Sequence, residues 1–582
     1  MNIKKLYIIL ITAVLSNLYG YSQIGDTISV YFNNDRCYVD SSTKDIQIEI
    51  ASCNIFISAS ASDSPLFVEL RGASDDGSIF INGNRPTNVL LNGLKLSSRT
   101  SGIICLKGKN DNKIIINDNT ENELSDFADG DQKACIYSKS SLSIGGSGFL
   151  KVNGNHKHAI ATKKAIYINK DAGEINLTCI SDGGKGMNAN DSITIDGGTI
   201  SILAKGNAVI EEENGIVDTT KASALKADSS IVINSGILKL ICTGSGSKCI
   251  NTDGTITIGS TCEDYDLPII TCENTGKTFG EEPKDEIDTQ SKPKGIKADG
   301  AIIVNKGCIK LHTTCDNAEG MESKSSITLN NCEIWAECYD DCINATGPIV
   351  VNNSFIHCVS NCNDAIDTNT HDIVTPAFTL NGGIVLAFSA GGPFEEGIDV
   401  NRSPIYINNG YLFAIGGQQG NVEPKVKGEH TAAYLRGVDT AKDKYYSLIV
   451  DNNPVMTLRM PCNPTGKYVL LSANGMLKKS SCRIEESLSA PSTHAKIDNC
   501  FWITPSTATA TNSYSWLQEA RYTKKDVFPL LETSITNTDT KKQEKYYTIT
   551  GIKQNTISKK GIVIKAFSDN NVTTNKKIVV NE

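Results

Sequence analysis

Eight polar residues fall into two sets that repeat together along the chain, and their types suggest metal chemistry. Each member of the first set precedes a member of the second by three positions. The first set is Glu319, Asp341, Asp364 and Glu396, and the second is Glu322, Asn344, Asp367 and Asp399. Their carboxylate and amide oxygens are hard ligands, of which Ca2+ takes about six to eight at about 2.3–2.6 Å. These eight residues are therefore predicted calcium ligands.

Other metals and a purely structural reading compete with this prediction. The seven histidines form no recognisable triad or metal motif, and the cysteines are not arranged as zinc ligands. Acidic residues are also common in solvated turns, so a single aspartate means little. Here the acids repeat in register, and carboxylates on neighbouring repeats repel one another unless a cation lies between them. Calcium is accordingly the favoured cofactor.

The elements that position these residues are short strands in a repeat. A small residue is followed by an apolar anchor, and two further apolar residues come six and eight positions after the anchor. Eight anchors obey this spacing, namely Ile136, Ile160, Met187, Leu225, Ile250, Ile296, Met321 and Ile343. Two more, Ile366 and Ile398, follow with insertions. Repeats of this length with alternating apolar residues predict a right-handed parallel β-helix, an all-β solenoid, of ten rungs.

Stacking places equivalent residues of successive rungs in columns, about 4.8 Å apart. We call the residues two positions before the anchors the leading column, and those one position after the anchors the trailing column. The last four rungs fill both columns with the eight candidate ligands, whereas earlier rungs carry Lys185 and Lys294, or Asn251 and Lys297. The interval between Ile250 and Ile296 leaves room for a loop over Cys262–Lys292. The acids are thus concentrated at one end of one edge.

Cysteine usage fits the same repeat. The position just before each anchor always holds Gly, Ala or Cys, which predicts a tight inward turn where only a small side chain fits. Cys315, Cys338 and Cys362 fall near rung ends, where a bridge between neighbouring rungs is an alternative. Cys462, Cys482 and Cys500 lie beyond the repeats and are the better disulfide candidates.

Composition and charge limit the partners. Forty-eight glycines and only 6% aromatic residues suit short strands separated by turns. A formal net charge of -9 argues against nucleic acid, which requires a basic face. Lys4 and Lys5 precede an apolar run over residues 6–18, so residues 1–22 are predicted to be a signal peptide. No later stretch reaches the roughly 18 apolar residues of a membrane span. We expect a secreted or cell-surface protein.

Two enzymatic activities are alternatives to a binding function. Calcium on a β-helix suggests a polysaccharide lyase acting by β-elimination, in which Lys297 or Lys324 would remove the proton, although such lysines are more often solvated charges. A second reading uses residues 339–343 (YDDCI) and 251–253 (NTD), which resemble motifs of polygalacturonase-type hydrolases. Anchors Ile250 and Ile343 are three rungs apart, roughly 14 Å, whereas inverting carboxylates lie about 6.5–9.5 Å apart. The hydrolase reading is therefore rejected.

The repeat block resembles a known family. Residues 294–300 (KGIKADG) and 319–323 (EGMES) are similar to the secreted calcium-binding β-helix family described as carbohydrate-binding domain-containing proteins. That family is related in shape to the family 9 pectate lyases and is described as binding cellulose and acidic pectic polymers. The resemblance covers about residues 90–480 and implies calcium and a polysaccharide partner. The strands expected over Tyr445–Val450 and Tyr468–Leu471 look like those that end the family's domain.

The C-terminal tail carries a second resemblance. Residues 547–551, 560–565 and 576–580 are similar to the sorting tail of type IX secreted proteins, which implies contact with that secretion machinery. They also predict three short strands of a small β module. We expect the β-helix over 23–430, its β-rich end over 431–520, a linker over 521–545 and the sorting-like tail over 546–582.

These observations predict a calcium-dependent, non-catalytic polysaccharide-binding protein for acidic (pectic) or cellulosic glycans. The first alternative is the pectate-type lyase described above. A surface adhesin or structural β-helix is the second alternative, because stiff solenoids offer long side surfaces. The strands are poor in exposed aromatic residues, with Trp335 the only tryptophan in the repeats, which favours binding through calcium and polar groups over stacking on crystalline cellulose.

Overall fold

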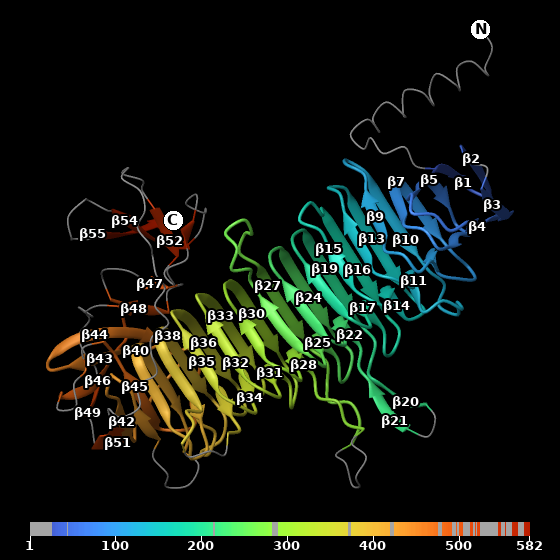
Figure 1. Ribbon diagram of the computed structural model, residues 1–582. Coiled ribbons are helices and arrows are strands. Elements are labelled where there is room, and N and C mark those ends of the chain that lie inside the picture. The colour runs from blue at the N-terminus through green and yellow to red at the C-terminus, as the bar shows by residue number, and fades with distance from the viewer. Residues whose placement is uncertain are drawn as a thin grey trace.

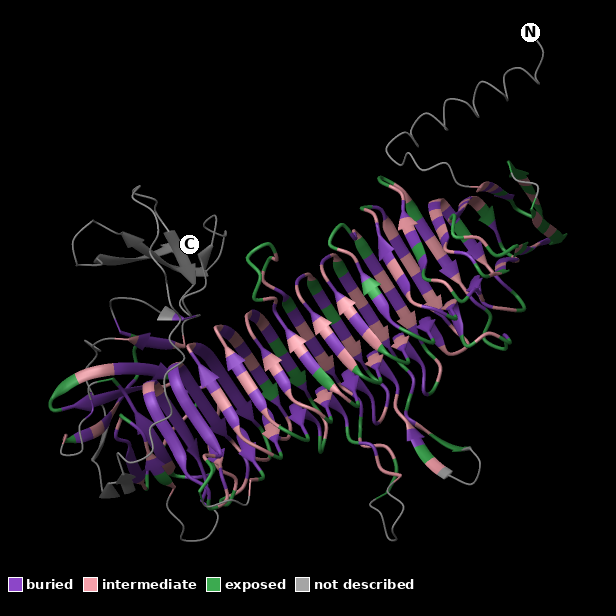
Figure 2. Cartoon of the chain, in the orientation of Figure 1, coloured by how far each residue is buried: buried purple, intermediate pink, exposed green. Residues whose placement is uncertain are grey.

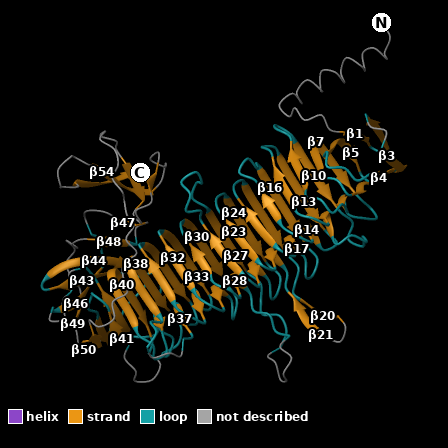
Figure 3. Cartoon of the chain, in the orientation of Figure 1, coloured by secondary structure: helices purple, strands orange, loops and turns teal. Residues whose placement is uncertain are grey.

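Short strands and tight turns build an elongated stack in the computed structural model (Figure 1). The structure describes residues 26–42, 45–213, 216–281, 289–370, 374–418, 424–474, 476, 480–491, 496–497 and 500–503, together with the backbone of later strands up to residue 581. None of the described residues is helical, and the loops gather at the edges of the stack (Figure 3). The predicted signal peptide and nearly all of the predicted linker lie outside the described residues.

Each rung contributes one strand to a fourteen-stranded sheet that carries the anchors, which we call the anchor stack. Its strands are β3 (Ile46–Ala51), β4 (Cys53–Ala59), β6 (Gly77–Gly83), β8 (Ile104–Leu106), β11 (Ala134–Ser138), β14 (His158–Thr162), β17 (Lys185–Ala189), β22 (Ser223–Ala227), β25 (Lys248–Thr252), β28 (Lys294–Ala298), β31 (Glu319–Ser323), β34 (Ile343–Ala345), β37 (Ile366–Thr368) and β39 (Ile398–Asp399). Apart from the antiparallel pair β3–β4, neighbours are parallel.

The pairing register confirms all ten predicted anchors as one column. Ile136 pairs with Ile160, and the column continues without a slip through Ile250 and Ile343 to Ile398. The same column also runs further toward the N-terminus, through Ile55, Ile79 and Ile104, on three rungs that the repeat pattern missed. Every anchor side chain from Ile55 to Ile366 is fully buried (Figure 2). The parallel β-helix prediction is confirmed.

The two other faces of each rung belong to a twenty-nine-stranded sheet. A second stack consists of β9 (Asn112–Ile116), β12 (Leu142–Gly145), β15 (Ile166–Ile168), β18 (Ser192–Ile195), β23 (Ser230–Ile233), β26 (Thr255–Ile258), β29 (Ile302–Val304), β32 (Ile327–Asn330) and β35 (Ile349–Asn352). A third consists of β10 (Glu121–Ser125), β13 (Phe149–Gly154), β16 (Glu174–Cys179), β19 (Thr199–Ala204), β24 (Ile237–Cys242), β27 (Ile269–Asn274), β30 (Gly307–Thr313), β33 (Cys332–Cys338) and β36 (Ser354–Ser360).

At both ends of the solenoid these two stacks merge into longer strands. The remaining members of the large sheet are β1 (Asp26–Asn33), β2 (Arg36–Ser41), β5 (Leu66–Ser74), β7 (Thr87–Ser97), β38 (Phe378–Ser389), β40 (Ile405–Gly416), β41 (Lys425–Lys427), β42 (Ala433–Arg436), β45 (Tyr468–Ser472), β50 (Gln518–Glu519) and β51 (Arg521–Thr523). Strand β7 pairs with both β9 and β10, and β38 pairs with both β35 and β36. The predicted apolar partners at the sixth and eighth positions form the second stack.

Polar ladders accompany the apolar columns. The amide of Asn330 donates to Oδ1 of Asn305 at 3.4 Å, Asn352 donates to Asn330 at 2.6 Å, Asn381 to Asn352 at 2.7 Å, and Asn408 to Asn381 at 2.7 Å. The amides of Asn330, Asn352 and Asn381 are therefore both donors and acceptors on successive rungs. Buried amides need such partners, because an unpaired polar group in the interior is destabilising. This asparagine ladder fixes the rung spacing near the acidic end.

Most of the cysteines are buried in the core, although Cys262 and Cys362 are exposed. Cys462 and Cys482 form no disulfide in the part of the chain that the structure describes, so the disulfide predicted for them is wrong. Cys135, Cys249 and Cys342 precede anchors and are fully buried, as the tight-turn interpretation expects. Burial raises the pKa of each of these thiols well above its usual value. They behave as small apolar side chains.

Two segments interrupt the regular rungs. A hairpin of β20 (Val209–Glu213) and β21 (Ile216–Thr220) projects from the edge of the stack (Figure 1). The predicted loop over Cys262–Lys292 is partly wrong, because Ile269–Asn274 within it forms β27 and continues the third stack between β24 and β30. The pattern missed this strand because it is preceded and followed by long turns.

The C-terminal part adds antiparallel strands. A six-stranded sheet contains β47 (Lys496–Ile497), β48 (Phe501–Ile503), β44 (Asn453–Arg459), β43 (Tyr445–Val450), β46 (Cys482–Ser487) and β49 (Asn512–Ser515). It packs on the outward side chains of the last rungs, including Phe355 and Phe388. The strands predicted at Tyr445–Val450 and Tyr468–Leu471 are confirmed as β43 and β45.

A separate four-stranded antiparallel sheet lies in the predicted tail. Its strands are β53 (Lys553–Gln554), β52 (Lys545–Thr548), β54 (Gly561–Phe567) and β55 (Asn575–Asn581). It includes the three strands predicted there and one short additional strand. In the portion of the chain that is described, no helix has the length and hydrophobicity to span a bilayer.

Candidate metal centre

The anchor stack aligns the trailing column, since parallel pairing puts equivalent residues side by side. Glu322 pairs with Asn344, Asn344 with Asp367, and Asp367 with Asp399. Side chains at this position point away from the buried anchors, because successive residues of a strand face opposite sides. The leading column lies at the start of the same strands, where Lys294 pairs with Glu319. The predicted arrangement of both columns is therefore present.

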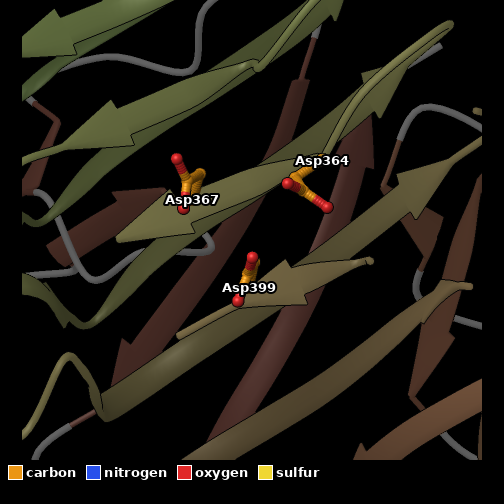
Figure 4. A group of neighbouring side chains, drawn as sticks. All are labelled: Asp364, Asp367 and Asp399. Atoms are coloured by element: carbon orange, nitrogen blue, oxygen red, sulfur yellow. The ribbon is translucent and has the colours of Figure 1, made fainter. Parts of the chain in front are cut away.

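Three of the eight predicted ligands come together as a carboxylate cluster. One oxygen each of Asp364, Asp367 and Asp399 lies within 4.8 Å of the other two. Asp364 lies two residues before β37, Asp367 lies on β37, and Asp399 lies on β39 of the next rung (Figure 4). Asp364 and Asp367 are buried, and Asp399 is half-buried. We call these three residues the aspartate cluster.

Local hydrogen bonds hold the cluster in place. Oδ1 of Asp364 accepts a hydrogen bond from the backbone N–H of Glu396, and Oδ2 of Asp367 accepts one from the Asn369 amide at 2.7 Å. Oδ1 of Asp399 accepts from the backbone N–H of Asn401 at 2.7 Å. Each carboxylate thus has one oriented oxygen. These donors are neutral, so they fix the carboxylates without balancing their charge.

Burial and mutual repulsion raise the proton affinity of these acids. Burial first, and then Asp399 and Asp367, raise the pKa of Asp364 to about 9. Burial first, and then Asp399, raise the pKa of Asp367 to about 7. Among the described residues, no lysine or arginine forms an ion pair with the aspartate cluster. No positive partner for the cluster therefore comes from the described residues, and bound protons or a cation would supply the missing charge.

Two of the three glutamates in the predicted set, Glu319 and Glu322, are balanced by lysines. Nζ of Lys294 lies 2.6 Å from Oε1 of Glu319 and 3.5 Å from Oε2 of Glu322, and Lys324 also pairs with Glu322. Burial opposes ionisation of Glu322, but Lys294 and Lys324 together lower its pKa to about 2. Burial raises the pKa of Glu319 despite Lys294. Glu319 and Glu322, at the start of the two acidic columns, therefore have their counter-charge within the protein.

The rung of Asp341 and Asn344 lies between the lysine-paired glutamates and the aspartate cluster. Oδ2 of Asp341 accepts a hydrogen bond from the Asn344 amide at 2.8 Å, and its Oδ1 accepts one from the backbone N–H of Asp364 at 3.1 Å. Burial, followed by Glu319, raises the pKa of Asp341 to about 10. The Asp341 carboxylate thus contacts the backbone of Asp364 in the aspartate cluster. Glu396 contributes its backbone N–H to Asp364, as described above.

Sequence reasoning placed Lys185 and Lys294 in the leading column but missed its other buried members on the earlier rungs. His158, Lys185, Ser223, Lys248 and Lys294 precede Glu319 on successive rungs, and all are buried. Burial lowers the pKa of Lys185 to about 8 and that of Lys248 well below its usual value. Both ammonium groups donate to oxygens of the chain, Lys185 to the Gly183 carbonyl at 2.8 Å and Lys248 to Ser291 Oγ at 2.9 Å. Reading the column over all rungs would have shown the change from basic to acidic.

The sequence also understated the aromatic residues at the surface. Phe56 and Phe80 occupy the trailing column on β4 and β6, on rungs that the pattern did not detect. Trp335, the aromatic residue singled out from the sequence, packs instead against Phe355 with ring centroids 4.9 Å apart. The expectation of few exposed aromatic residues is therefore wrong at the N-terminal end.

Both lysines that could remove a proton from a sugar ring form ion pairs. Lys297 forms an ion pair with Asp299, and Lys324 forms one with Glu322. In the predicted hydrolase motifs, Ile250 and Ile343 are separated by Ile296 and Met321 in the anchor column, as the rejection of that activity assumed.

Comparisons with known proteins give one structural and one family likeness. No curated protein matches the chain. A solved structure described as the polysaccharide lyase-like protein from C. thermocellum, a gadolinium derivative, shares 19% sequence identity over 51% of this chain and 97% of its own length, with a TM-score of 0.30. Residues 54–319, from β4 to the first residue of β31, match the family model described as "Carbohydrate-binding domain-containing protein".

Proposed function

We propose that this protein is exported and binds polysaccharide, with a calcium ion in the aspartate cluster, and that it does so without cleaving the glycan. The observation that carries the metal proposal is the set of three carboxylates within 4.8 Å, on two rungs, without a lysine or arginine partner among the described residues. Three negative groups held this closely repel one another strongly when ionised. A divalent cation offsets that repulsion and replaces the bound protons.

The donor set fits calcium. Asp364, Asp367 and Asp399 would hold the ion, and all three offer carboxylate oxygens. Calcium accepts oxygen ligands in flexible geometry, while zinc prefers nitrogen and sulfur. Because three carboxylates leave its coordination incomplete, the ion supplies a place for water or for the carboxylate of a uronic acid. An acidic glycan is therefore the substrate class that this end of the solenoid suits.

Polysaccharide as the partner is supported by the family match over residues 54–319. That match lies on the same stack of rungs as the aspartate cluster but ends before it. A binding role without catalysis is supported by the ion pairs of Lys297 and Lys324, which hold both ammonium groups against carboxylates. A lysine that removes a ring proton must instead be free to accept it.

Export is part of the proposal. It is motivated by the predicted signal peptide over residues 1–22 and by the similarity of the tail to type IX sorting domains. We propose release to the medium or retention at the cell surface, where calcium is abundant. Growth-medium and cell-surface fractions, probed with an antibody to the anchor stack, test this step, and a protein confined to the cytoplasm would contradict it.

Titration calorimetry tests the metal and glycan together. Asp364→Asn keeps an acceptor oxygen for the Glu396 N–H but removes a charge from the cluster, whereas Asp299→Asn changes an aspartate on the same stack whose partner is Lys297. We expect Asp364→Asn to weaken calcium binding, and oligogalacturonate binding in calcium, by at least about tenfold, or about 1.4 kcal/mol. Asp299→Asn should bind both like the wild type. Equal affinities for the two variants would refute the proposed site.

A further inference from the structure

A row of aromatic side chains lies on the outer face of the anchor stack, far from the aspartate cluster. Phe56, Phe80 and Tyr137 occupy the trailing column on β4, β6 and β11, with Cys105 between the last two. The Phe56 ring is 43% exposed, and Phe80 and Tyr137 are half-buried. The ring centroids of Phe56 and Phe80 are 5.8 Å apart. The row is thus an apolar surface several rungs long. Its strands, from β4 to β11, lie at the N-terminal end of the solenoid (Figure 1).

Lys107 closes the gap in this row. Its Nζ lies 5.7 Å from the centroid of Phe80 and 4.6 Å from that of Tyr137, so the cation contacts both rings. The same Nζ donates to Oε1 of Gln132 at 3.1 Å. These contacts hold the lysine chain over Cys105, where the column has no ring. We call Phe56, Phe80, Lys107 and Tyr137 the aromatic row.

Polar groups line one side of the row. Phe56 and Phe80 line a groove of about 340 Å³ together with Asn54, Asp131 and Gln132. Asp131 accepts a hydrogen bond from Ser101 Oγ at 3.0 Å, and Asn54 accepts one from Ser78 Oγ at 2.7 Å. These bonds orient the polar edge and leave the Asn54 amide N–H and the second Asp131 oxygen to interact with a ligand. An apolar floor with a few directed polar groups is typical of small-ligand and sugar sites.

We infer that the aromatic row and its polar edge bind neutral pyranose units of a polysaccharide, without calcium. A pyranose ring with equatorial hydroxyls has flat C–H faces that pack on aromatic rings, while its hydroxyls reach groups at the side. Asp131 and Lys107 offset each other in charge, so the groove does not select an anion. This site goes beyond the proposed function, because it requires neither the metal nor an acidic sugar.

Two further observations favour a glycan over a protein at this surface. Rungs are about 4.8 Å apart, close to the advance of one sugar along an extended β-1,4-linked glucan, so successive sugars would meet successive side chains of the row. The whole row also lies within residues 54–319, the segment matched by the carbohydrate-binding family model. The aspartate cluster lies outside that segment. A neutral β-glucan is therefore the ligand class to which the row is assigned.

Affinity electrophoresis in gels containing hydroxyethylcellulose and EDTA tests this site. Phe80→Leu keeps an apolar side chain but removes the planar ring, and Phe56→Ala truncates a ring that is already 43% exposed. Tyr167→Ala, on β15 of the second stack, is the control because this tyrosine is 42% exposed and lies on a different face. We expect hydroxyethylcellulose to retard the wild type and Tyr167→Ala, and both phenylalanine variants to bind at least about tenfold more weakly.

Thermal melting of each variant confirms that the fold is retained. The inference is overturned if hydroxyethylcellulose does not retard the wild type, or if folded Phe80→Leu and Phe56→Ala are retarded as strongly as the wild type. Since the gel contains EDTA, the result does not depend on the aspartate cluster. Conversely, both phenylalanine variants should keep wild-type calcium affinity, so failure of the metal proposal and failure of this inference are distinguished.

Discussion

The Nζ atom of Lys294 lies 2.6 Å from Oε1 of Glu319 on the next rung. This contact marks the boundary between the basic and acidic halves of the leading column. Both side chains are almost fully buried, with exposed fractions of 5% and 9%. Glu319 and Glu322, the acids next to the boundary, are neutralised by lysine. The aspartate cluster two rungs further on is not. The boundary therefore separates a structural ion-pair network from a candidate metal site.

Replacing Lys294 with methionine should destabilise the fold strongly. The variant keeps the side-chain length but leaves two buried glutamates without their common cation, and breaking a buried pair by removing one partner costs about 3–5 kcal/mol. Urea unfolding measures the loss. Lys324→Met is the matched control, because this lysine is 55% exposed and its ion pair with Glu322 is worth about 0–1 kcal/mol. Similar losses in both variants would contradict the assignment of Lys294 as the buried counter-charge.

Calcium should stabilise the protein more at pH 8 than at pH 5. Raised pKa values mean that the folded, calcium-free protein holds protons on Asp364 and Asp367 that an unfolded aspartate, with a pKa of about 3.9, has released. In EDTA, stability should therefore fall as the pH rises from about 4 toward 9. Calcium replaces those protons, so the difference in melting temperature between calcium and EDTA should grow over the same range.

Scanning fluorimetry in calcium and in EDTA at both pH values provides this measurement. Asp364→Asn should reduce both the fall in EDTA and the gain with calcium, since it removes the titrating group. Melting curves that do not change with EDTA, together with no metal by elemental analysis, would rule out the calcium site.

Polygalacturonate should not be cleaved by this protein. Lys297 and Lys324 are held in ion pairs with Asp299 and Glu322, so neither is placed to accept a proton from the sugar ring. β-Elimination produces an unsaturated sugar that absorbs in the ultraviolet, and we expect no increase in this absorbance with calcium present. Appearance of that product, and its loss in Lys297→Ala or Lys324→Ala, would establish a lyase instead.

Truncating the centre of the asparagine ladder should weaken the solenoid. Asn352 donates to Asn330 and accepts from Asn381, so Asn352→Ala leaves the half-buried amide of Asn330 and the buried amide of Asn381 incompletely paired. An unsatisfied buried polar group costs about 1–3 kcal/mol. Asn453→Ala, at an exposed asparagine that begins β44, should change stability by no more than about 0.5 kcal/mol. Chemical unfolding of both variants compares the two losses.

The repeat could be predicted where each rung keeps the same turn. From Ile136 onward, an apolar residue recurs six positions after every uninterrupted anchor, and all of these rungs were detected. In the earlier rungs, Asn112 takes the place that Leu142 fills later, and it comes eight positions after Ile104. Two extra residues and a polar substitution hide the pattern. Asn112 is tolerated in the core because its amide donates to Ser138 Oγ at 2.9 Å.

The candidate site could be predicted only in part. Column positions follow from strand periodicity, so the sequence was enough to align the eight candidate residues in two columns. Which of them share a counter-charge depends on how far a side chain reaches between rungs, and Lys294 reaches forward to Glu319. The aromatic row was missed for a different reason, because Phe56 and Phe80 lie on two of the three rungs that the repeat pattern did not detect.

The two ends of the solenoid differ from its middle in strand direction. Strands β2 and β3 pair antiparallel to β1 and β4, and β45 pairs antiparallel to β40. A stack of parallel rungs is an open template, because each exposed edge can accept a rung of another molecule and extend into a fibre. Reversing the terminal strands removes that match in direction and register. The antiparallel ends therefore set the length of the molecule and prevent one solenoid from continuing into the next.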